Sequence, residues 1–548
     1  MKISSLFSRI LLYWNTIKYL KKVQIFYQIW YRSRKNWRLL IRFKYPLSLP
    51  SSSKSIILIP WIEKQKSYSA LRFIFLNQEV DYEEEGKIAV DWNEMRFGRL
   101  WAYNLNYMDY LLQPGINNAD GNKLIENFVS DLPDNYIGLE PYTISLRAIN
   151  WIKYFSTGKI KTAAYDNCLY AQYKILIDSL EYHILGNHLL VNGFSLLFGS
   201  FYFNEKSFFE AAHKILTNEL NEQVLYDGGH FELSTMYHQI VLEGLLDSIN
   251  LIQNNYCFSS QESLLLLLQE KAKKMIFWIN AMTFSNRLVP LLNDSAYGIA
   301  PSTDVLNEYS KKLGLISADQ IINIQSVKKP NFLRESGYRR FNSPAYECIL
   351  DVGQIGAYYQ PGHAHADTFN FCLCVHNEPL IIDPGVSTYE NNTDRQKQRS
   401  TSMHNTVTVQ HKNSSEVWSS FRVGRRAKTI ILDESKNHIH AKHDGYSNLT
   451  HFRKWQFNEE KIEIEDVLKG MNDVGTANFI IHPGIKPVVT GTLVQTRLGI
   501  FEFINGNDIK IIQIKVPGGF NKFFDSWKVE ITFSVWLKTI IHIKPNIV

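Results

Sequence analysis

The hydrophobic periodicity of this chain changes near residue 330, and no other feature of the sequence restricts the fold as strongly. Before that point, apolar residues recur three and four positions apart, which is the spacing of amphipathic helices. After it, apolar and polar residues alternate, β-branched residues become frequent and short turns separate the segments. We therefore expect an α+β protein in which a large α-helical domain precedes a domain of antiparallel strands.

The expected helices follow one another without intervening strands, an order that suits an (α/α) toroid. The clearest lie at residues 171–185, 207–220, 238–253 and 263–282. The expected strands indicate stacked antiparallel sheets, as in a β-sandwich. The clearest lie at residues 347–352, 368–375, 406–410, 428–432, 461–467, 478–481, 509–516 and 529–537. The predicted domains are a basic, aromatic helical arm with its linker at residues 1–54, a toroid at residues 55–328 and a β-sandwich domain at residues 329–548.

The first 54 residues carry 12 of the chain's 59 Lys and Arg residues and contain no Asp or Glu. Aromatic residues such as Trp14, Trp30 and Trp37 are interleaved with these charges. Such an arm could rest on an acidic membrane surface or contact a polyanion or a polysaccharide-assembly partner. It could equally dock as a basic helical face on the rest of the protein.

We expect neither a secretory signal nor a membrane-spanning helix. Arg9 interrupts the short apolar stretch near the N-terminus, and no small-residue cleavage site follows it. No window approaches the roughly 18 consecutive apolar residues of a spanning helix. These features favour a cytoplasmic or peripherally membrane-associated protein over a secreted one.

A Pro-Gly-His-Ala-His-Ala-Asp segment at residues 361–367 is the strongest local signal for a functional site. We expect it to open a strand, and strand geometry would then send His363, His365 and Asp367 to one face. An ordinary core does not accept three such groups without partners. The segment therefore predicts a metal site or an active site.

Two further residues, Asp383 and His404, complete a candidate ligand set. Two histidines and one carboxylate with open coordination positions suit a zinc-like ion. Either Asp367 or Asp383 can supply the carboxylate. The spacing of His365 and Asp367, with His404, also resembles the facial triad of iron oxygenases, which we keep as an alternative.

Two places in the helical region carry residues suited to proton transfer. Asn187 and His188 follow a glycine that breaks a helix, and they offer an amide for a carboxylate and an imidazole for a proton. Tyr237 lies at an expected helix start, five residues after Glu232, and a Tyr there can act as an acid or a base. The structural alternatives are a helix N-cap at Asn187 and an amphipathic core position for Tyr237.

Residues 140–151 contain a third candidate surface, which includes Tyr142. Arg147 and Trp151 lie four residues apart and share a helix face. The pair could bind an anionic sugar by hydrogen bonding from Arg147 and stacking on Trp151. The alternative is an Arg stem that packs beside a core Trp.

Taken in order, five of these segments resemble the motifs of the heparinase II/III family of polysaccharide lyases. They are Asn187-His188, residues 227–238, residues 362–367, residues 382–385 and residues 404–406. Residues 100–107 also resemble a segment of the family's N-terminal domain. The resemblance extends over about residues 85–545, and the change from helices to strands falls where the family has it.

The resemblance implies an incomplete (α/α) toroid packed on an antiparallel β-sandwich domain, with the substrate cleft between them. It implies that Asn187 neutralises a uronate carboxylate and that Tyr237 donates a proton to the leaving oxygen. His188 and His363 would be the candidate bases. Four further residues are expected to contact the substrate, namely Arg147, Trp151, Glu232 and Tyr142.

The resemblance also implies a divalent metal ion, zinc in preference to calcium, with a mainly structural role. His365, Asp383 and His404 would hold it, which favours Asp383 over Asp367 as the ligand. No nucleic acid, nucleotide or redox cofactor is implied.

The predicted function is β-elimination on a uronic-acid-containing polysaccharide, glycosaminoglycan-like or from a bacterial surface, in a bacterial cell. Removal of the proton α to a carboxylate builds up negative charge, which an amide or imidazole must offset while a Tyr protonates the leaving oxygen. Three alternatives stay open. They are a glycoside hydrolase that uses Glu232 and Asp227, a uronate C5-epimerase, and a non-catalytic glycan-binding accessory of polysaccharide biosynthesis.

Overall fold

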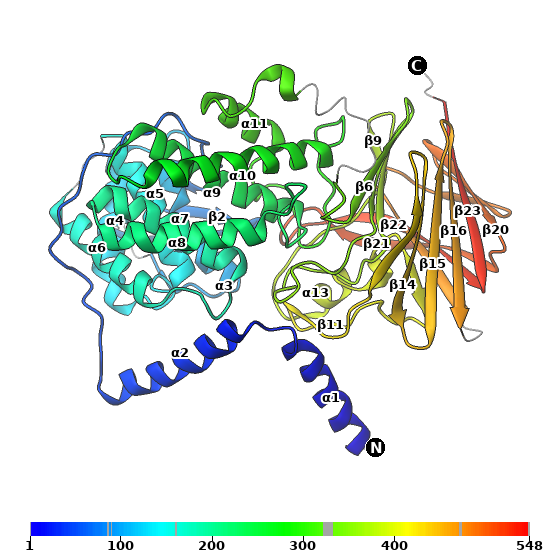
Figure 1. Ribbon diagram of the computed structural model, residues 1–548, viewed down its shortest axis with the longest axis horizontal. Coiled ribbons are helices and arrows are strands. Elements are labelled where there is room, and N and C mark those ends of the chain that lie inside the picture. Colours follow the sequence, from blue (N-terminus) through cyan, green and yellow to red (C-terminus); the bar gives the residue numbers. More distant parts are fainter. Residues whose placement is uncertain are drawn as a thin grey trace.

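The computed structural model describes residues 2–84, 87–88, 90–158, 162–321, 333–470 and 474–545. Helices gather at one end of the molecule and sheets at the other, with two N-terminal helices beneath them (Figure 1). The expected fold, a helical toroid followed by antiparallel sheets, is confirmed. The expected boundary between residues 328 and 329 lies outside the described residues.

The N-terminal arm consists of α1 (Lys2–Ile17) and α2 (Lys22–Leu40). In Figure 1, α2 lies below the helical domain and α1 lies below the sheets. The chain then runs without helix or strand from residue 43 to residue 67 along the outside of the helical domain. Its backbone is held there by side chains such as Asn250, whose amide pairs with both backbone groups of Ile59.

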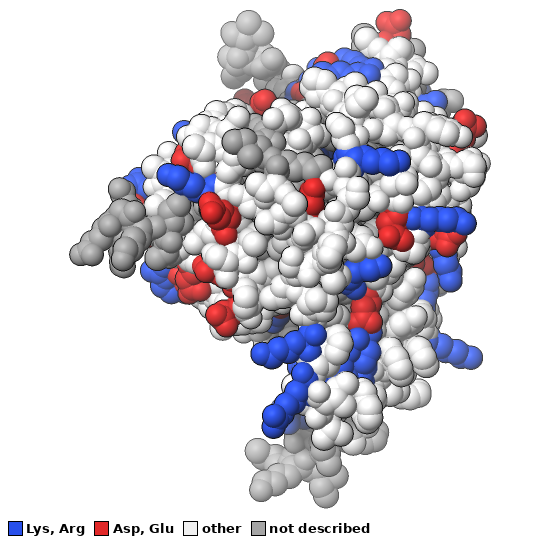
Figure 2. Space-filling model, turned by 90° about the vertical axis from the view of Figure 1, so that its left-hand side faces the viewer, with Lys and Arg blue, Asp and Glu red and all other residues white. Residues whose placement is uncertain are grey.

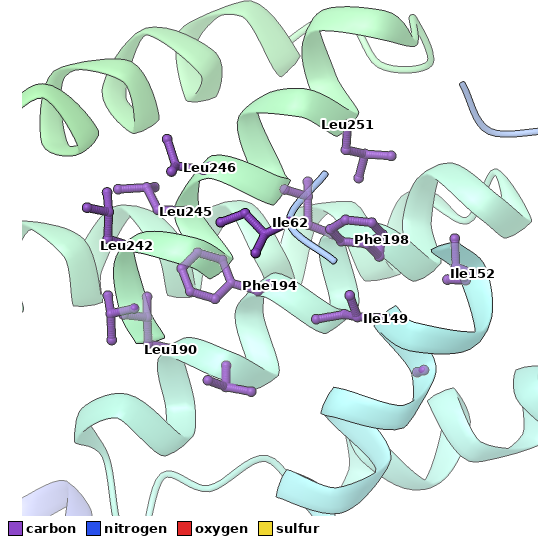
Figure 3. Packing of buried hydrophobic residues seen from close by; sticks show 14 of the residues in the cluster. Ile62, Ile149, Ile152, Leu190, Phe194, Phe198, Leu242, Leu245, Leu246 and Leu251 are labelled. Atoms are coloured by element: carbon purple, nitrogen blue, oxygen red, sulfur yellow. The ribbon is translucent and has the colours of Figure 1, made fainter. Parts of the chain in front are cut away.

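The helical domain is built around α7, which is buried along almost its whole length. Phe194 and Phe198 of α7 meet Leu242 of α9 and Ile149 of α5, and Ile62 of the linker completes this core (Figure 3). The domain comprises α3 (Arg99–Tyr107), η1 (Asp109–Leu112), α4 (Asn118–Asp131), η2 (Leu132–Asp134), α5 (Pro141–Ser156), α6 (Ala163–Asp178), α7 (Gly186–Phe203), α8 (Lys206–Gln223), α9 (Thr235–Asn254), α10 (Gln261–Met282) and α11 (Thr303–Lys312).

Three of the four expected helices match α8, α9 and α10 closely, and the fourth is wrong at its C-terminal end. Helix α6 stops at Asp178, so residues 179–185 form the loop that leads into α7. Leu185 ends that loop with a φ of 65°, a conformation that cannot continue a helix. This loop matters because it sets where Asn187 begins α7.

The expectation that no strands interrupt the helical region is also wrong. A small antiparallel sheet contains β1 (Tyr68–Ser69), β2 (Arg72–Phe75) and β3 (Gln78–Asp81), and β4 (Glu83–Glu84) pairs with β5 (Lys87–Ile88). In β2, Phe73 and Phe75 are buried while their neighbours are exposed. Alternation over only four residues was too short to distinguish this strand from a loop.

The β domain contains two eight-stranded antiparallel sheets. Phe479 of one sheet packs on Phe501 of the other, with ring centroids 5.8 Å apart, inside a shared apolar core. One sheet contains β6 (Tyr338–Asn342), β7 (Tyr346–Asp351), β8 (Phe371–Val375), β9 (Glu378–Ile381), β10 (Val407–Val409), β17 (Val474–Ile481), β21 (Asp508–Pro517) and β22 (Phe523–Ser534). The other contains β13 (Thr429–Glu434), β14 (His438–Tyr446), β15 (Leu449–Phe457), β16 (Lys461–Gly470), β18 (Val488–Thr490), β19 (Leu493–Gln495), β20 (Gly499–Ile504) and β23 (Trp536–Ile543).

Most expected strands coincide with these, but the strand expected at residues 529–537 is wrong, because it crosses a turn. Val535, with a φ of 67°, separates β22 from β23, and these belong to different sheets. Short elements near the site complete the domain. They are β11 (Val417–Trp418), β12 (Arg422–Val423), α13 (Thr393–Gln398) and η4 (Thr401–Met403).

The loop before α9 contacts the segment that leads into the β domain, and its position 228 requires glycine. The Asp227 carboxylate accepts hydrogen bonds from the backbone N–H and hydroxyl of Ser336, in the segment leading to β6. Gly228 follows with a φ of 92°, in the left-handed region that favours glycine. A Cβ there would lie 2.1 Å from the backbone oxygen of Lys274 in α10.

We expect Gly228→Ala to lower the free energy of unfolding by about 2–4 kcal/mol, because the added methyl group must displace backbone atoms. Gly298→Ala is the matched control, since Gly298 has a φ of 80° but no atom within 4 Å of the added Cβ. The control should cost only about 1 kcal/mol. Urea denaturation measures both, and equal losses would contradict the steric argument.

Candidate functional site

Three segments that lie far apart in the sequence bring the predicted catalytic residues together. Asn187 and His188 lie in the first turn of α7, Tyr237 lies in the first turn of α9, and His363 lies on the loop before β8. The Tyr237 ring stacks on the His363 imidazole, with ring centroids 3.8 Å apart. His363 Nε2 lies 3.8 Å from Oε2 of Glu232, which also binds Asn187. The site therefore spans the two domains.

Glu232 holds Asn187 in place. The Nδ2 of Asn187 donates to both carboxylate oxygens of Glu232, at 3.0 and 2.9 Å, and its backbone N–H donates to Oε1 at 3.2 Å. The Glu232 side chain is only 2% exposed. The expected substrate contact from Glu232 is therefore wrong in this structure, because the carboxylate is buried beneath Asn187 and positions that amide instead.

His188 is paired with a second carboxylate. Its Nδ1 lies 2.8 Å from Oε1 of Glu181, in the loop between α6 and α7. Burial disfavours the imidazolium, but the attraction and hydrogen bond of Glu181 outweigh burial and raise the pKa of His188. The ring of Tyr142 lies beside the imidazole, with centroids 4.6 Å apart. The substrate contact expected from Tyr142, which is half-buried here, stays a prediction.

Tyr237 is held in its protonated form. Burial raises its pKa well above 10, and the neighbouring Tyr389 adds to this effect. The two hydroxyl oxygens are 3.1 Å apart, which is within hydrogen-bonding distance. A phenol with a raised pKa stays neutral near neutral pH, so Tyr237 is suited to donate a proton.

Asp294 fixes His363 and was not predicted from the sequence. Its Oδ2 lies 2.9 Å from His363 Nδ1, its Oδ1 lies 2.9 Å from His365 Nε2, and both oxygens accept hydrogen bonds from Arg395. Burial alone would raise the pKa of Asp294, but Arg395 and His363 hold it well below the usual range. Asp294 lies in an irregular loop, where neither hydrophobic periodicity nor a local motif marks it.

Two of the three predicted metal ligands, Asp383 and His404, converge with Asp367, the carboxylate that the resemblance disfavoured. Ligand atoms of Asp367, Asp383 and His404 lie within 4.8 Å of one another, and all three residues are buried. His365 lies next to them, with its ring centroid 5.2 Å from that of His404. Three buried atoms here have no hydrogen-bond partner, namely His365 Nδ1, Asp367 Oδ2 and His404 Nε2. Buried polar atoms without partners are costly, and an ion held by the cluster would satisfy those of Asp367 and His404.

The strand expected at residues 361–367 is wrong, although the residues it carries do converge. The segment is irregular, and the strand β8 starts only at Phe371. His363 and His365 therefore meet through Asp294 and not through strand alternation. Asp367 turns instead toward Asp383 and His404.

The substrate contacts expected from Arg147 and Trp151 are also wrong. Both residues are fully buried in α5. Arg147 donates to Gln172 and to the backbone oxygens of Asn106 and Gly138, and burial lowers its pKa to about 9. The pair therefore stabilises the inside of the toroid, as the alternative for this segment proposed.

Comparison with known proteins agrees with this architecture. Residues 155–323 match the heparinase II/III N-terminus and residues 326–541 match the heparinase II/III-like C-terminal domain. A heparin-sulfate lyase from Bacteroides stercoris is 25% identical over 298 residues, which are 50% of this chain and 42% of that protein. This alignment therefore spans less than half the length of that relative.

Solved structures share the fold. A heparinase III superimposes with a TM-score of 0.67 at 16% identity, over 95% of this chain and 91% of that chain. A heparan sulfate lyase from Pedobacter heparinus superimposes with a TM-score of 0.57 at 17% identity, over 87% of this chain and 82% of that chain. With its N- and C-terminal domains both matched in order, the chain belongs to the heparinase II/III family.

Proposed function

We propose that this protein is a polysaccharide lyase that cleaves a uronic-acid-containing polymer by β-elimination. The observation that carries the proposal is the meeting of Asn187, His188, Tyr237 and His363 at the junction of the two domains. An amide, an imidazole with a raised pKa, a neutral phenol and a second imidazole are groups that suit this reaction.

Each group has a role that follows from its partners. Glu232 fixes the orientation of the Asn187 amide, which is the proposed hydrogen-bonding partner of the uronate carboxyl group. His188, whose pKa is raised, offsets the negative charge that develops on that carboxyl group. Both interactions favour loss of the neighbouring C5 proton.

His363 is the proposed base, and Tyr237 is the proposed acid. Asp294 accepts the Nδ1 proton of His363, which leaves Nε2 to take the C5 proton. The C5–H and C4–O4 bonds break, a C4–C5 double bond forms, and the Tyr237 hydroxyl protonates O4 of the leaving sugar. The stacking of the two rings places the acid next to the base.

The hydrolase alternative is less well supported. It needs two carboxylates that face the substrate, but Asp227 is hydrogen-bonded to Ser336 and Glu232 is buried beneath Asn187. A C5-epimerase would share the proton abstraction but leave the chain uncut. A non-catalytic glycan-binding accessory would not depend on the Tyr237 hydroxyl.

The substrate and the site of action are proposals too. The relatives are named for heparin sulfate and heparan sulfate, which favours an anionic, glycosaminoglycan-like polymer, from outside or from the cell's own surface. The named relatives are bacterial.

Within the described residues, no helix is both long and apolar enough to cross a bilayer. We place the protein in the cytoplasm or at a membrane surface, with residues 1–54 as the contact to the membrane or to an assembly partner.

We expect the purified protein to produce unsaturated uronate ends, seen as a rise in ultraviolet absorbance, on at least one member of a panel of uronate polysaccharides. Tyr237→Phe and His363→Ala should each lower kcat about 10²–10⁴-fold, because each removes a proton-transfer group. Tyr226→Phe, at an 86% exposed position, is the control and should keep full activity. Chain shortening without the absorbance would contradict elimination.

We also propose that His365, Asp383 and His404 hold a structural divalent ion, with Asp367 as a further ligand. The partnerless His365 Nδ1, Asp367 Oδ2 and His404 Nε2 support this proposal. Two imidazoles with carboxylates fit zinc better than calcium, which prefers oxygen ligands alone. When bound, the ion would neutralise the buried carboxylates and hold the loop that carries His363. Of the two carboxylates, that of Asp383 has fewer free acceptor positions for an ion, because His404, Asn370 and the backbone N–H of Gly385 already contact it.

Metal analysis tests this site independently of activity. We expect about one zinc per chain, a lower melting temperature after treatment with a chelator, and recovery on adding zinc. His404→Ala should lose the metal. His438→Ala is the control, since the His438–Asp433 pair is near the surface of the β domain. A metal-free protein whose melting temperature does not respond to zinc would contradict the proposal.

A further inference from the structure

Helix α2 contacts the helical domain through a mixed face, in which Val23 packs on the apolar core, Tyr27 stacks on Tyr182 and polar groups form hydrogen bonds. Gln24 Nε2 donates to the backbone oxygen of Ile184 at 3.0 Å, and the Tyr31 hydroxyl donates to that of Leu180 at 2.5 Å. Near the end of the helix, Arg34 and Arg38 both pair with Asp178, at the C-terminus of α6. These residues recur three, four and seven positions apart, so they form one face of the helix.

The opposite face of α2 is apolar and exposed to solvent. Its members also recur three and four positions apart, and Trp37 and Leu40 are 61% and 76% exposed. The face consists of Phe26, Ile29, Trp30, Trp37 and Leu40. A surface helix of a globular protein normally turns its apolar stripe inward, whereas α2 carries a second, wide apolar stripe on its exposed side. An exposed apolar stripe of this size is typical of an interaction surface.

Helix α1 also has one face on the protein and one exposed apolar face, and its Tyr13 ring packs edge-on against Trp418. Thr16 accepts a hydrogen bond from the Trp418 indole at 3.2 Å, which ties the helix to the β domain. On the other side, Ile10, Trp14 and Ile17 are all exposed, at 48–63%. The two helices therefore present two apolar faces from one arm.

The junction between the helices fixes these faces relative to the rest of the protein. Lys21 pairs with Glu222 of α8, while the Tyr19 ring packs edge-on against Tyr358 of the β domain, with centroids 5.1 Å apart. Arg426 lies over the same Tyr19 ring, 3.8 Å from its centroid. The arm is thus attached to both domains.

Unpaired positive charge surrounds the apolar faces. Lys22, Arg32, Lys35, Arg42 and Lys44 have no ion-pair partner among the described residues. No Asp or Glu occurs in the first 54 residues. Figure 2 shows Lys and Arg gathered at the lower end of the molecule, where the arm lies in Figure 1. Exposed Trp, Phe, Ile and Leu combined with basic residues are the signature of a helix that lies in a bilayer interface.

We propose that the exposed faces of α1 and α2 dock on the surface of an anionic lipid bilayer. Lipid chains accept the apolar side chains, and anionic headgroups attract the unpaired cations. A soluble polyanion would use the charges but leave Trp37 and Leu40 in water. A second copy of the chain would bring two strongly basic arms together, which charge repulsion opposes. The proposal does not depend on the lyase activity.

Vesicle sedimentation with the full-length protein tests this inference. We expect binding to vesicles of phosphatidylcholine with phosphatidylglycerol, and much weaker binding to phosphatidylcholine alone. Arg32→Gln with Lys35→Gln and Arg42→Gln should weaken binding about a hundredfold at low salt. Phe26→Ser with Trp30→Ser and Trp37→Ser should weaken it by about a hundredfold or more.

The matched control replaces three exposed apolar residues elsewhere, as Tyr226→Ser with Tyr256→Ser and Leu266→Ser. It should bind like the parent, and circular dichroism and melting temperature confirm that all variants fold. Three results would overturn the proposal. The first is equal binding to anionic and neutral vesicles, and the second is unchanged binding of the apolar variant. The third is that binding to soluble polyglutamate, or self-association of the protein, accounts for all of the sedimentation seen with vesicles.

Discussion

A buried carboxylate holds the site together. Asp294 comes from the helical domain, and its partners His363, His365 and Arg395 come from the β domain. The side chains of Asp294, His365 and Arg395 are fully buried. Burying a charge is costly unless it is paired and hydrogen-bonded. Here each oxygen of Asp294 accepts a hydrogen bond from Arg395 and contacts a histidine nitrogen. The two domains must therefore meet in one arrangement for this charge to be satisfied.

The contacts of Asp294 shape both the proposed active site and the proposed metal site. By binding Nδ1 of His363, Asp294 fixes the ring against Tyr237 and selects the nitrogen left for the substrate. By binding His365 Nε2, it leaves Nδ1 of that residue without a hydrogen-bond partner, beside the Asp367–Asp383–His404 cluster. The proposed active site and the proposed metal site thus share one positioning residue.

The sequence predicted the fold and most residues of the candidate site, because both depend on patterns that are local in the chain. Periodicity identified α8, α9 and α10, and motif order brought Asn187, Tyr237 and His363 into one hypothesis. The small sheet at β2 was missed because its alternation is too short. Arg147 was misassigned because an amphipathic helix position does not reveal whether a charge faces a cleft or the inside of a toroid. Asp294 was missed because its role arises only when the two domains pack together.

The most direct test of this account is the kcat of Asp294→Asn compared with that of Asp466→Asn. Asp466 is an equally buried carboxylate that pairs with Arg453 and His451 inside the β domain and forms no hydrogen bond with the proposed catalytic residues. Both variants should lose stability, so kcat is measured below both melting temperatures. We predict that Asp294→Asn lowers kcat about a hundredfold or more with little change in KM, while Asp466→Asn keeps near-parental kcat. Equal effects of the two variants would contradict the claim that Asp294 positions the catalytic histidine.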